Sequence, residues 1–249
     1  MAGTLYLLPV PLADHDPRQV LPAPVVQIAR SLRYVLAESA RSARAFLKAA
    51  GHPGPIQTVR IVEIGTAPVA AQADAWLDPL LSQEPVTDAA LVSECGCPGI
   101  ADPGAVIVER AHAAGIRVCP LVGPSSLFLA LMGSGMNGQR FRFLGYLPQD
   151  LEALGHRLGQ VERDAQRDET QIFIETPYRT ERLFQAILSR FAGSTRLCLA
   201  VDLGAPSQTI VSMTIERWRA LAEPQRPTLK RRPAVFLVHA RPAPRGMRQ

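Results

Sequence analysis

The stretch "AALVSECGCPGIADPGAVIVERAHAAG", residues 89–115, indicates the fold class of this protein. It begins with a short apolar run over 89–93, which is typical of a buried strand. A loop of glycines, prolines and two acidic residues follows, and 105–115 then has the pattern of a helix that ends at Gly115. A strand, a tight loop and a helix in this order form the repeating unit of a parallel α/β sheet.

The same alternation extends to both sides of this stretch. Apolar runs predict strands over 4–10, 34–39, 58–64 and 116–122. Helical spacing predicts helices over 24–32, 40–50 and 70–81, and Pro79 is expected to end or kink the last of these. Strands separated by helices pair in parallel, so the first part of the chain is predicted to be a doubly wound parallel sheet.

The second part of the chain has a different order of elements. Strands are predicted over 140–148, 170–175, 195–203, 207–215 and 233–240; helices are predicted over 123–136, 151–161 and 177–191, with a short one near Trp218. Several of these strands follow one another without a full helix between them, which favours a mixed sheet. We therefore expect two α/β domains, residues 1–121 and 122–249, joined near residues 121–124.

The composition excludes several classes of protein. Hydrophobic residues make up 47% and charged residues 20%, as in globular proteins, and no apolar run reaches membrane-spanning length. The first residues lack the basic flank of a secretory signal, so we expect a cytoplasmic protein. Cys95 and Cys97 are too close to bridge, and the four cysteines are expected to be reduced structural thiols. The five scattered histidines predict no metal site.

The chain carries a formal net charge of +5, which permits an anionic partner. The excess of positive charge lies late in the sequence, at Arg226, Lys230, Arg231, Arg232, Arg241, Arg245 and Arg248. Such a cluster is typical either of a solvated basic face or of a surface that faces nucleic acid.

The loop after the strand at 89–93 is a candidate binding site. Ligands of doubly wound sheets bind beyond the carboxyl ends of the strands. Gly96, Gly99 and Gly104 leave backbone amides uncovered, and Pro98 and Pro103 keep the loop stiff. The plainer alternative is a turn without a ligand.

The residue types in this loop narrow the kind of ligand. Glu94 and Asp102 supply carboxylates that can accept hydrogen bonds from ribose hydroxyls or from an amine. The loop lacks both the G-x-G-x-x-G fingerprint and a P-loop lysine, which disfavours dinucleotides and triphosphates. A neutral or cationic nucleoside suits these residues better.

Six motifs along the chain resemble, in order, those of the tetrapyrrole (corrin/porphyrin) methylase superfamily. They are "TLYLLPVPL", "AESARSARAFL", "ALVSECGCPGIADPG", "AGIRVCPLVGPSS", "FRFLGYLP" and "IFIETPYRTERL". The chain looks most similar to the branch of ribosomal RNA small-subunit methyltransferase I. The resemblance implies a methyltransferase dependent on S-adenosylmethionine, with two α/β domains, the cofactor in the cleft between them, and a homodimer.

The resemblance also implies which residues contact S-adenosylmethionine. From the first domain these are Pro9, Glu94, Gly96, Cys97, Pro98, Ile100 and Ala101. From the start of the second half and beyond they are Ser125, Ser126, Phe173, Glu175 and Asp202. The loop around Gly96 is expected to contact the cofactor largely through backbone groups.

Three residues are candidates for a role in catalysis. Glu38 and Arg41 lie in "AESAR", where the RNA-modifying branch has A-E-D-T-R, and they either position substrate or form a surface salt bridge. Asp102 either acts as a base or caps the helix that begins near Gly104. Arg179 keeps the arginine of another family motif, in which Tyr178 replaces a histidine.

The methyl acceptor stays open between two classes. The basic segment favours a ribose hydroxyl of RNA. A small molecule such as a tetrapyrrole is favoured by the departures in "AESAR" and by "VDLGAPSQTI", which is neutral where the RNA branch is basic. Two alternatives come from other classes: a non-catalytic protein that binds S-adenosylmethionine or RNA, and a dinucleotide-binding domain, which the missing glycine fingerprint disfavours.

Overall fold

The computed structural model describes residues 2–82 and 86–240. The chain divides into two compact units, Met1–Ser125 and Ser126–Gln249. The division falls after Ser125, a few residues beyond the boundary expected from the sequence. Each unit contains its own five-stranded sheet and its own hydrophobic core.

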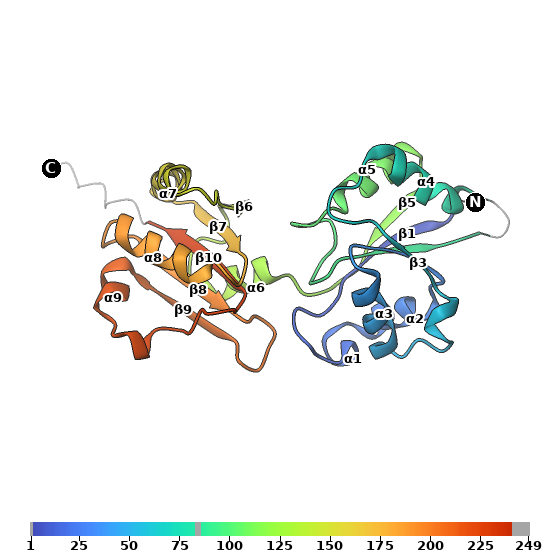
Figure 1. The fold of residues 1–249 in the computed structure, drawn as a ribbon, viewed down its shortest axis with the longest axis horizontal. Helices are drawn as coiled ribbons and strands as arrows, with labels where there is room; N and C mark the ends of the chain where they lie inside the picture. Colours follow the sequence, from blue (N-terminus) through green and yellow to red (C-terminus); the bar gives the residue numbers. More distant parts are fainter. Residues whose placement is uncertain (1, 83–85, 241–249) are drawn as a thin grey trace. The chain divides into compact units, whose positions relative to one another are not determined.

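The first unit is a doubly wound parallel sheet, as the sequence predicts (Figure 1). Its strands follow the order β3-β2-β4-β1-β5, and every pair is parallel. In chain order the elements are β1 (Thr4–Leu8), α1 (Pro17–Val20), α2 (Ala23–Ser31), β2 (Tyr34–Ala37), α3 (Ala40–Ala49), the 3-10 turn η1 (Ile56–Thr58), β3 (Arg60–Glu63), α4 (Ala70–Leu81), β4 (Ala89–Val92), α5 (Ala105–Ala113) and β5 (Arg117–Pro120).

Helices cover both faces of this sheet. Val35 and Ala37 of β2 pack into one core with α2 and α3, whereas Tyr34 and Leu36 pack into the other with α4 and α5. All four residues of β2 and all four of β4 are buried, which explains their continuous apolar sequences.

Helix α4 spans the predicted residues and continues past Pro79 to Leu81, so the proline does not end it. Leu77 and Leu80 are almost completely buried in the core, and this packing holds the last turn in place. The backbone N–H of Gly3 also donates to the carbonyl of Leu80 at 2.7 Å, which satisfies a helix-end acceptor.

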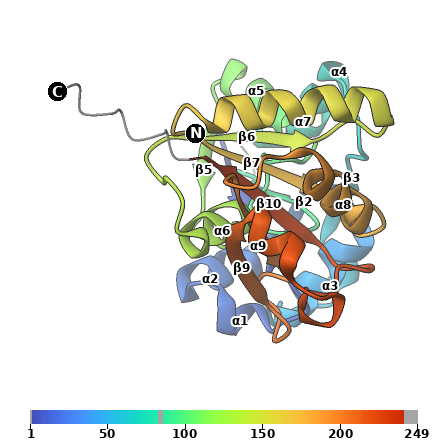
Figure 2. The same ribbon diagram turned by 90° about the vertical axis from the view of Figure 1, so that its left-hand side faces the viewer.

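The second unit has a mixed sheet in the order β6-β7-β10-β8-β9 (Figure 2). The β6–β7 pair is parallel, whereas β10 pairs antiparallel with β7 and β8, and β8 pairs antiparallel with β9, which follows it through a short loop. Its elements are α6 (Ser126–Ser134), β6 (Phe141–Tyr146), α7 (Leu151–Ala165), β7 (Thr170–Glu175), α8 (Thr180–Arg190), β8 (Arg196–Val201), β9 (Thr209–Thr214), α9 (Ile215–Ala220), the 3-10 turn η2 (Glu223–Gln225) and β10 (Ala234–His239).

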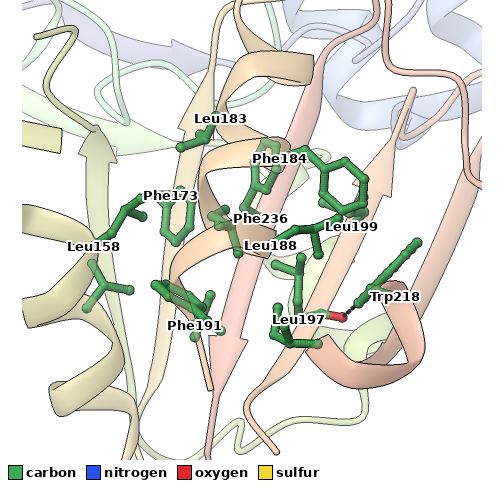
Figure 3. Close-up of a cluster of buried hydrophobic side chains, with 14 of the residues drawn as sticks. Leu158, Phe173, Leu183, Phe184, Leu188, Phe191, Leu197, Leu199, Trp218 and Phe236 are labelled. Atoms are coloured by element: carbon green, nitrogen blue, oxygen red, sulfur yellow. Dashed lines mark hydrogen bonds between the residues drawn. The ribbon is translucent and has the colours of Figure 1, made fainter. Parts of the chain in front are cut away.

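The larger core of the second unit lies between its sheet and the helices α7, α8 and α9 (Figure 3). Trp218 of α9 is completely buried, and its indole N–H donates to the carbonyl of Leu197 at 3.0 Å. Its ring also meets that of Phe184 edge-on, with centroids 5.4 Å apart. Helix α6 contacts β8, β9 and β10.

Helix α8 begins later than the sequence suggests. Its first residue is Thr180 rather than Pro177, and residues 177–179 form a turn. The buried hydroxyl of Thr180 donates to the carbonyl of Pro177 at 3.2 Å or of Leu229 at 2.9 Å. None of the helices within 2–82 and 86–240 is both long and apolar enough to cross a membrane.

Candidate functional site

Three loops meet at the carboxyl edge of the first sheet. Strands β1, β2 and β4 end at the same level, since Val92 lies opposite both Leu8 and Ala37. The backbone N–H of Val10 donates to the carbonyl of Gly96 at 2.9 Å, which joins the loop after β1 to the loop after β4. The segment after β5 packs just as closely, because a Cβ on Gly123 would lie 2.3 Å from the ring of Pro9.

Gly96 is the tightest point of the loop after β4. Its φ of +74° is a conformation that residues with a side chain rarely adopt. A Cβ there would lie 3.0 Å from Cδ2 of Leu12 and 3.2 Å from the carbonyl oxygen of Pro124. Gly99 and Ala101 also have positive φ, +82° and +59° respectively. The loop thus has a fixed and unusual backbone path.

The carboxylate of Asp102 holds this path in place. It accepts hydrogen bonds from the backbone N–H of Gly99 at 2.9 Å and of Gly104 at 2.8 Å. Gly104 is the residue that immediately precedes α5. The sequence left two roles open for Asp102, a catalytic base or a cap of the helix near Gly104. These contacts match the second role, because they shape the loop and the start of the helix.

A cluster of four acidic residues, Glu38, Glu63, Glu94 and Asp102, lies at the same edge of the sheet. Burial, followed by the nearby charges of Glu94 and Asp102, raises the pKa of Glu38 above its ordinary value. The Ser42 hydroxyl donates to Glu94 at 3.3 Å, and Glu63 at the end of β3 accepts from the backbone N–H of Ala40 at 2.9 Å. The negative potential of these carboxylates suits a ligand that carries positive charge.

Helix α3 begins at this edge, where the side chain of Ser39 caps its first turn. Arg41, Arg44 and Lys48 are exposed and follow one another at helical spacing. Within the described ranges, none of the three forms an ion pair closer than 4 Å with an acidic residue. A line of three positive charges without acidic partners therefore extends along α3, away from the acidic cluster.

The cysteines of the loop are held as thiols by their surroundings. The Sγ of Cys97 lies 3.3 Å from the carbonyl oxygen of Pro124, and burial raises the pKa of this thiol. Burial and then the charge of Glu94 raise the pKa of Cys95. All four cysteines are free. Among the described residues, no group of three or more His, Cys, Asp or Glu side chains could hold a metal ion.

The second unit brings two of its predicted site residues to one edge of its sheet. Glu175 ends β7, and Asp202 follows β8; Ala234 of the strand between them pairs with Glu175 on one side and with Val201 on the other. Glu175 is buried and lies 2.6 Å from a guanidinium nitrogen of Arg179.

Asp202 forms a similarly short ion pair with an arginine. Its carboxylate lies 2.7 Å from Arg232 and accepts from the hydroxyl of Ser207 at 2.7 Å. Burial acts to raise the pKa of Asp202, but the hydrogen bonds from Arg232 and Ser207 keep it below its ordinary value. Its φ of +51° marks a backbone position that these contacts hold in place.

Phe173, which the resemblance assigns to the cofactor, has its side chain in the core, so a contact with the cofactor through its backbone stays a prediction. It is completely buried in the core of the second unit and stacks on Phe236 with ring centroids 5.5 Å apart (Figure 3). Its side chain is therefore unavailable to a ligand. Ser125 ends the first unit and Ser126 begins α6, and both are partly exposed.

The late basic cluster is partly structural. Arg232 pairs with Asp202, and Arg226 donates to the carbonyl of Arg219 at 3.3 Å. Lys230 and Arg231 are exposed. The remaining members, Arg241, Arg245 and Arg248, lie outside the described residues.

Sequence reasoning missed the residues that press against the loop from outside it. Leu12 and Pro124 contact Gly96, and Gly123 contacts Pro9. The available signal was the Gly-Pro pair directly after the strand at 116–122, because a glycine at a strand end often marks a close approach of two backbones. Only pairing of the strands shows which backbone it approaches.

The first unit fits a nucleoside that carries a cationic group. Cys97 and Gly99 are partly exposed in the loop, and Ile100 and Ala101 are exposed beside them. Glu94, also exposed, offers a carboxylate to a hydroxyl or an amine. S-adenosylmethionine has these features: a ribose, an amino group and a sulfonium.

Comparison with known proteins agrees with this assignment. No family model matches the sequence. Among curated relatives, ribosomal RNA small subunit methyltransferase I of Xylella fastidiosa is 32% identical over 216 residues, which is 86% of this chain and 73% of that protein. The protein of the same name from Pseudomonas aeruginosa is 29% identical over 248 residues, which is 98% of this chain and 82% of that protein.

Solved structures share the fold at lower identity. The methyltransferase CobJ superposes with a TM-score of 0.61 at 16% identity, over 96% of this chain and 95% of that one. The cobalt precorrin-4 methyltransferase CbiF gives 0.59 at 11% identity, over 95% and 94%. These two structures establish the two-unit fold, and the level of identity with the first relative, over most of both chains, establishes the family. This chain belongs to the family of ribosomal RNA small subunit methyltransferase I.

Proposed function

We propose that this protein transfers the methyl group of S-adenosylmethionine to a ribose 2'-hydroxyl of small-subunit ribosomal RNA. The observation that carries the proposal is the loop after β4, whose positive-φ glycines and Asp102 bonds fix an unusual backbone path at the carboxyl edge of a parallel sheet. Family membership supports both the reaction and the class of RNA.

The cofactor is proposed to bind along this loop through Gly96, Cys97, Pro98, Ile100 and Ala101. The neighbouring Pro9, Glu94, Ser125 and Ser126 belong to the same proposal, as do Glu175 and Asp202 of the second unit. When bound, S-adenosylmethionine supplies an electrophilic methyl group on a sulfonium, whose leaving group is neutral and needs no acid. The task of the protein is therefore to hold nucleophile, methyl carbon and sulfur in line.

A ribose hydroxyl is a weak acid, so a nearby base assists its attack. Glu38 is the candidate, because its raised pKa brings it closer to neutral pH than an ordinary carboxyl. Arg41 begins the exposed positive line on α3 and is proposed to hold an RNA phosphate close to Glu38. Asp102 is proposed to act through the shape of the loop.

The test measures binding and transfer separately. Calorimetric titration with S-adenosylmethionine is expected to show one site, and labelled methyl is expected to appear in small-subunit ribosomal RNA. Binding without transfer to that RNA, whether protein-free or in the subunit, would support a non-catalytic binding protein instead. An absence of binding would reject the site itself.

The charge on α3 gives a second test. Replacing Arg41, Arg44 and Lys48 together by glutamine is expected to weaken RNA binding and to reduce its salt slope by about 1 for each phosphate that these side chains neutralise. The same variant is expected to bind S-adenosylmethionine normally. Equal RNA affinity at all salt concentrations would exclude α3 from the RNA surface.

The cellular setting and assembly are part of the proposal. Four free cysteines suit a reducing compartment, so we place the protein in the cytoplasm. A homodimer is proposed from the family resemblance. Phe128 and Met132 of α6 and Phe141 of β6 are exposed apolar side chains, with the two phenylalanine rings 6.0 Å apart, and they offer a surface to a second copy. Light scattering that gives the mass of one chain would reject the dimer.

A further inference from the structure

A groove on the outer side of the second unit carries positive charge that the proposed reaction does not use. It has a volume of about 460 Å³ and lies on α7, next to the last residue of α8. It is lined by Gly155, Gly159, Arg163 and Arg190, together with His156, Glu152 and Leu151. Figure 2 shows α7 along the margin of this unit.

The guanidinium groups of the two arginines lie close over the two glycines. A Cβ on Gly155 would lie 3.3 to 3.4 Å from the guanidinium nitrogens of Arg190, and one on Gly159 would lie 3.4 Å from a guanidinium nitrogen of Arg163. Gly155 and Gly159 are one helical turn apart, so the two guanidinium groups lie over neighbouring positions of one helix face, about 6 Å apart along the axis.

Neither arginine is neutralised within the described residues. Arg190 has only a weak bond to the hydroxyl of Ser189 at 3.4 Å, and neither Arg190 nor Arg163 forms an ion pair there. Glu152, the acidic residue of the groove, lies 4.0 Å from His156.

The other acidic residues of α7 near these arginines have partners of their own. Glu162 accepts from the backbone of Ala192 and from Thr195, and Asp164 pairs with Arg167. The groove therefore keeps a net positive charge.

We infer that this groove binds the phosphate backbone of the RNA substrate, at a position separate from the site at the carboxyl edge of the first sheet. Two neighbouring guanidinium groups without a carboxylate partner are suited to phosphate oxygens, which arginine binds through paired N–H donors. The inference rests on the proposed function for the choice of RNA as the source of phosphate. The binding of phosphate itself is inferred from the positive charge of the groove, its volume and its two arginines without acidic partners.

The experiment compares two double variants that remove equal charge. Arg163→Gln with Arg190→Gln removes the groove arginines, whereas Arg157→Gln with Arg167→Gln removes two arginines outside the groove lining. Binding of labelled, protein-free small-subunit ribosomal RNA is measured by fluorescence anisotropy from 50 to 200 mM salt. Thermal unfolding and titration with S-adenosylmethionine check that both variants are folded.

The groove variant is expected to bind the RNA with a salt slope smaller by about 1.4 to 1.8, the contribution of two neutralised phosphates. Over this salt range the wild-type protein then loses about seven- to twelvefold more affinity than the variant. The control variant is expected to keep the wild-type slope within about 0.5. Equal slopes for the groove variant and the wild type, or equal reductions in both double variants, would overturn the inference.

A third variant keeps the charge and fills the space. Gly155→Leu places a side chain where Arg190 now lies, and leucine favours the helix, so the fold is expected to be retained. RNA binding is expected to weaken about tenfold although the net charge is unchanged. Wild-type binding by this variant would show that the groove is not used.

Methyl transfer by the wild-type protein separates the two proposals. If it methylates the RNA while the groove variants bind RNA normally, only the groove inference fails. If it binds S-adenosylmethionine but methylates no small-subunit RNA, the proposed function fails, and the anisotropy measurements still report on the groove.

Discussion

Substituting Gly96 by alanine tests the central feature of the site. Gly96 has a φ of +74°, and left-handed backbone costs a residue with a side chain about 1–2 kcal/mol. The new Cβ would also lie 3.0 Å from Leu12 and 3.2 Å from the carbonyl of Pro124. Such overpacking adds about 1–3 kcal/mol, so the free energy of unfolding is expected to fall by about 2–5 kcal/mol in total.

Gly115→Ala is a matched control for this variant. Gly115 ends the helical segment of α5 with a φ of +70°, and a Cβ there would meet nothing within 4 Å. The free energy of unfolding of Gly115→Ala should therefore fall only by the cost of the left-handed backbone, about 1–2 kcal/mol. The difference between the two variants isolates the contacts that press on Gly96.

Urea unfolding measures stability, and calorimetric titration measures the Kd for S-adenosylmethionine. To relieve its contacts, Gly96→Ala must displace the loop backbone, and each 1.4 kcal/mol of binding free energy removed in this way weakens binding about tenfold. We expect the Kd to rise about 10- to 100-fold in Gly96→Ala and to stay unchanged in Gly115→Ala. A wild-type Kd for folded Gly96→Ala would refute the argument that this loop holds the cofactor.

Three further outcomes are expected. Asp102→Ala removes the acceptor of two backbone N–H groups and should lower unfolding free energy by about 1–3 kcal/mol and weaken cofactor binding; an unchanged urea midpoint would contradict this. Glu38 has a raised pKa, so its protonated form favours folding at low pH and this stability is lost as pH rises through that pKa. Glu38→Gln should therefore gain stability relative to wild type between pH 4 and pH 7, and a constant difference in urea unfolding would count against the shift. Trp218→Phe removes the indole donor to the carbonyl of Leu197 and leaves a cavity, which should cost about 2–4 kcal/mol by urea unfolding with cofactor affinity unchanged; a loss under 1 kcal/mol would contradict the role of this side chain.

Much of the fold was predictable because it depends on local patterns. The strand, loop and helix around residues 89–115 predicted a parallel sheet, and the closely spaced strands after residue 195 predicted a mixed one; both are confirmed. The predicted S-adenosylmethionine-dependent methyltransferase is confirmed by the family of its relatives. Of the two effects expected at Pro79, an end of the helix is excluded, because burial of Leu80 holds the last turn in place.

The candidate site was predictable only in part. Motif resemblance assigns Gly96, Glu38 and Phe173 to the site, and these assignments stay predictions, but it could not show that the ring of Phe173 belongs to the core. A motif identifies a residue in the sequence, but it does not show where the side chain of that residue points. That direction depends on the neighbouring strands. Asp202 likewise could be named from the sequence, but its pairing with Arg232, 30 positions away, could not.

The sequence by itself determined the order of strands and helices, the bare loop after β4 and the absence of a dinucleotide fingerprint, since each depends on residues close together in the chain. The tertiary structure decided which distant segments close on that loop, namely Val10 and Leu12 after β1 and Pro124 after β5. It also decided that Arg163 and Arg190 share a groove, because only the packing of α8 beside α7 brings them together. Periodicity records which face of an element is buried; the partner buried against it is set by the packing of the whole unit.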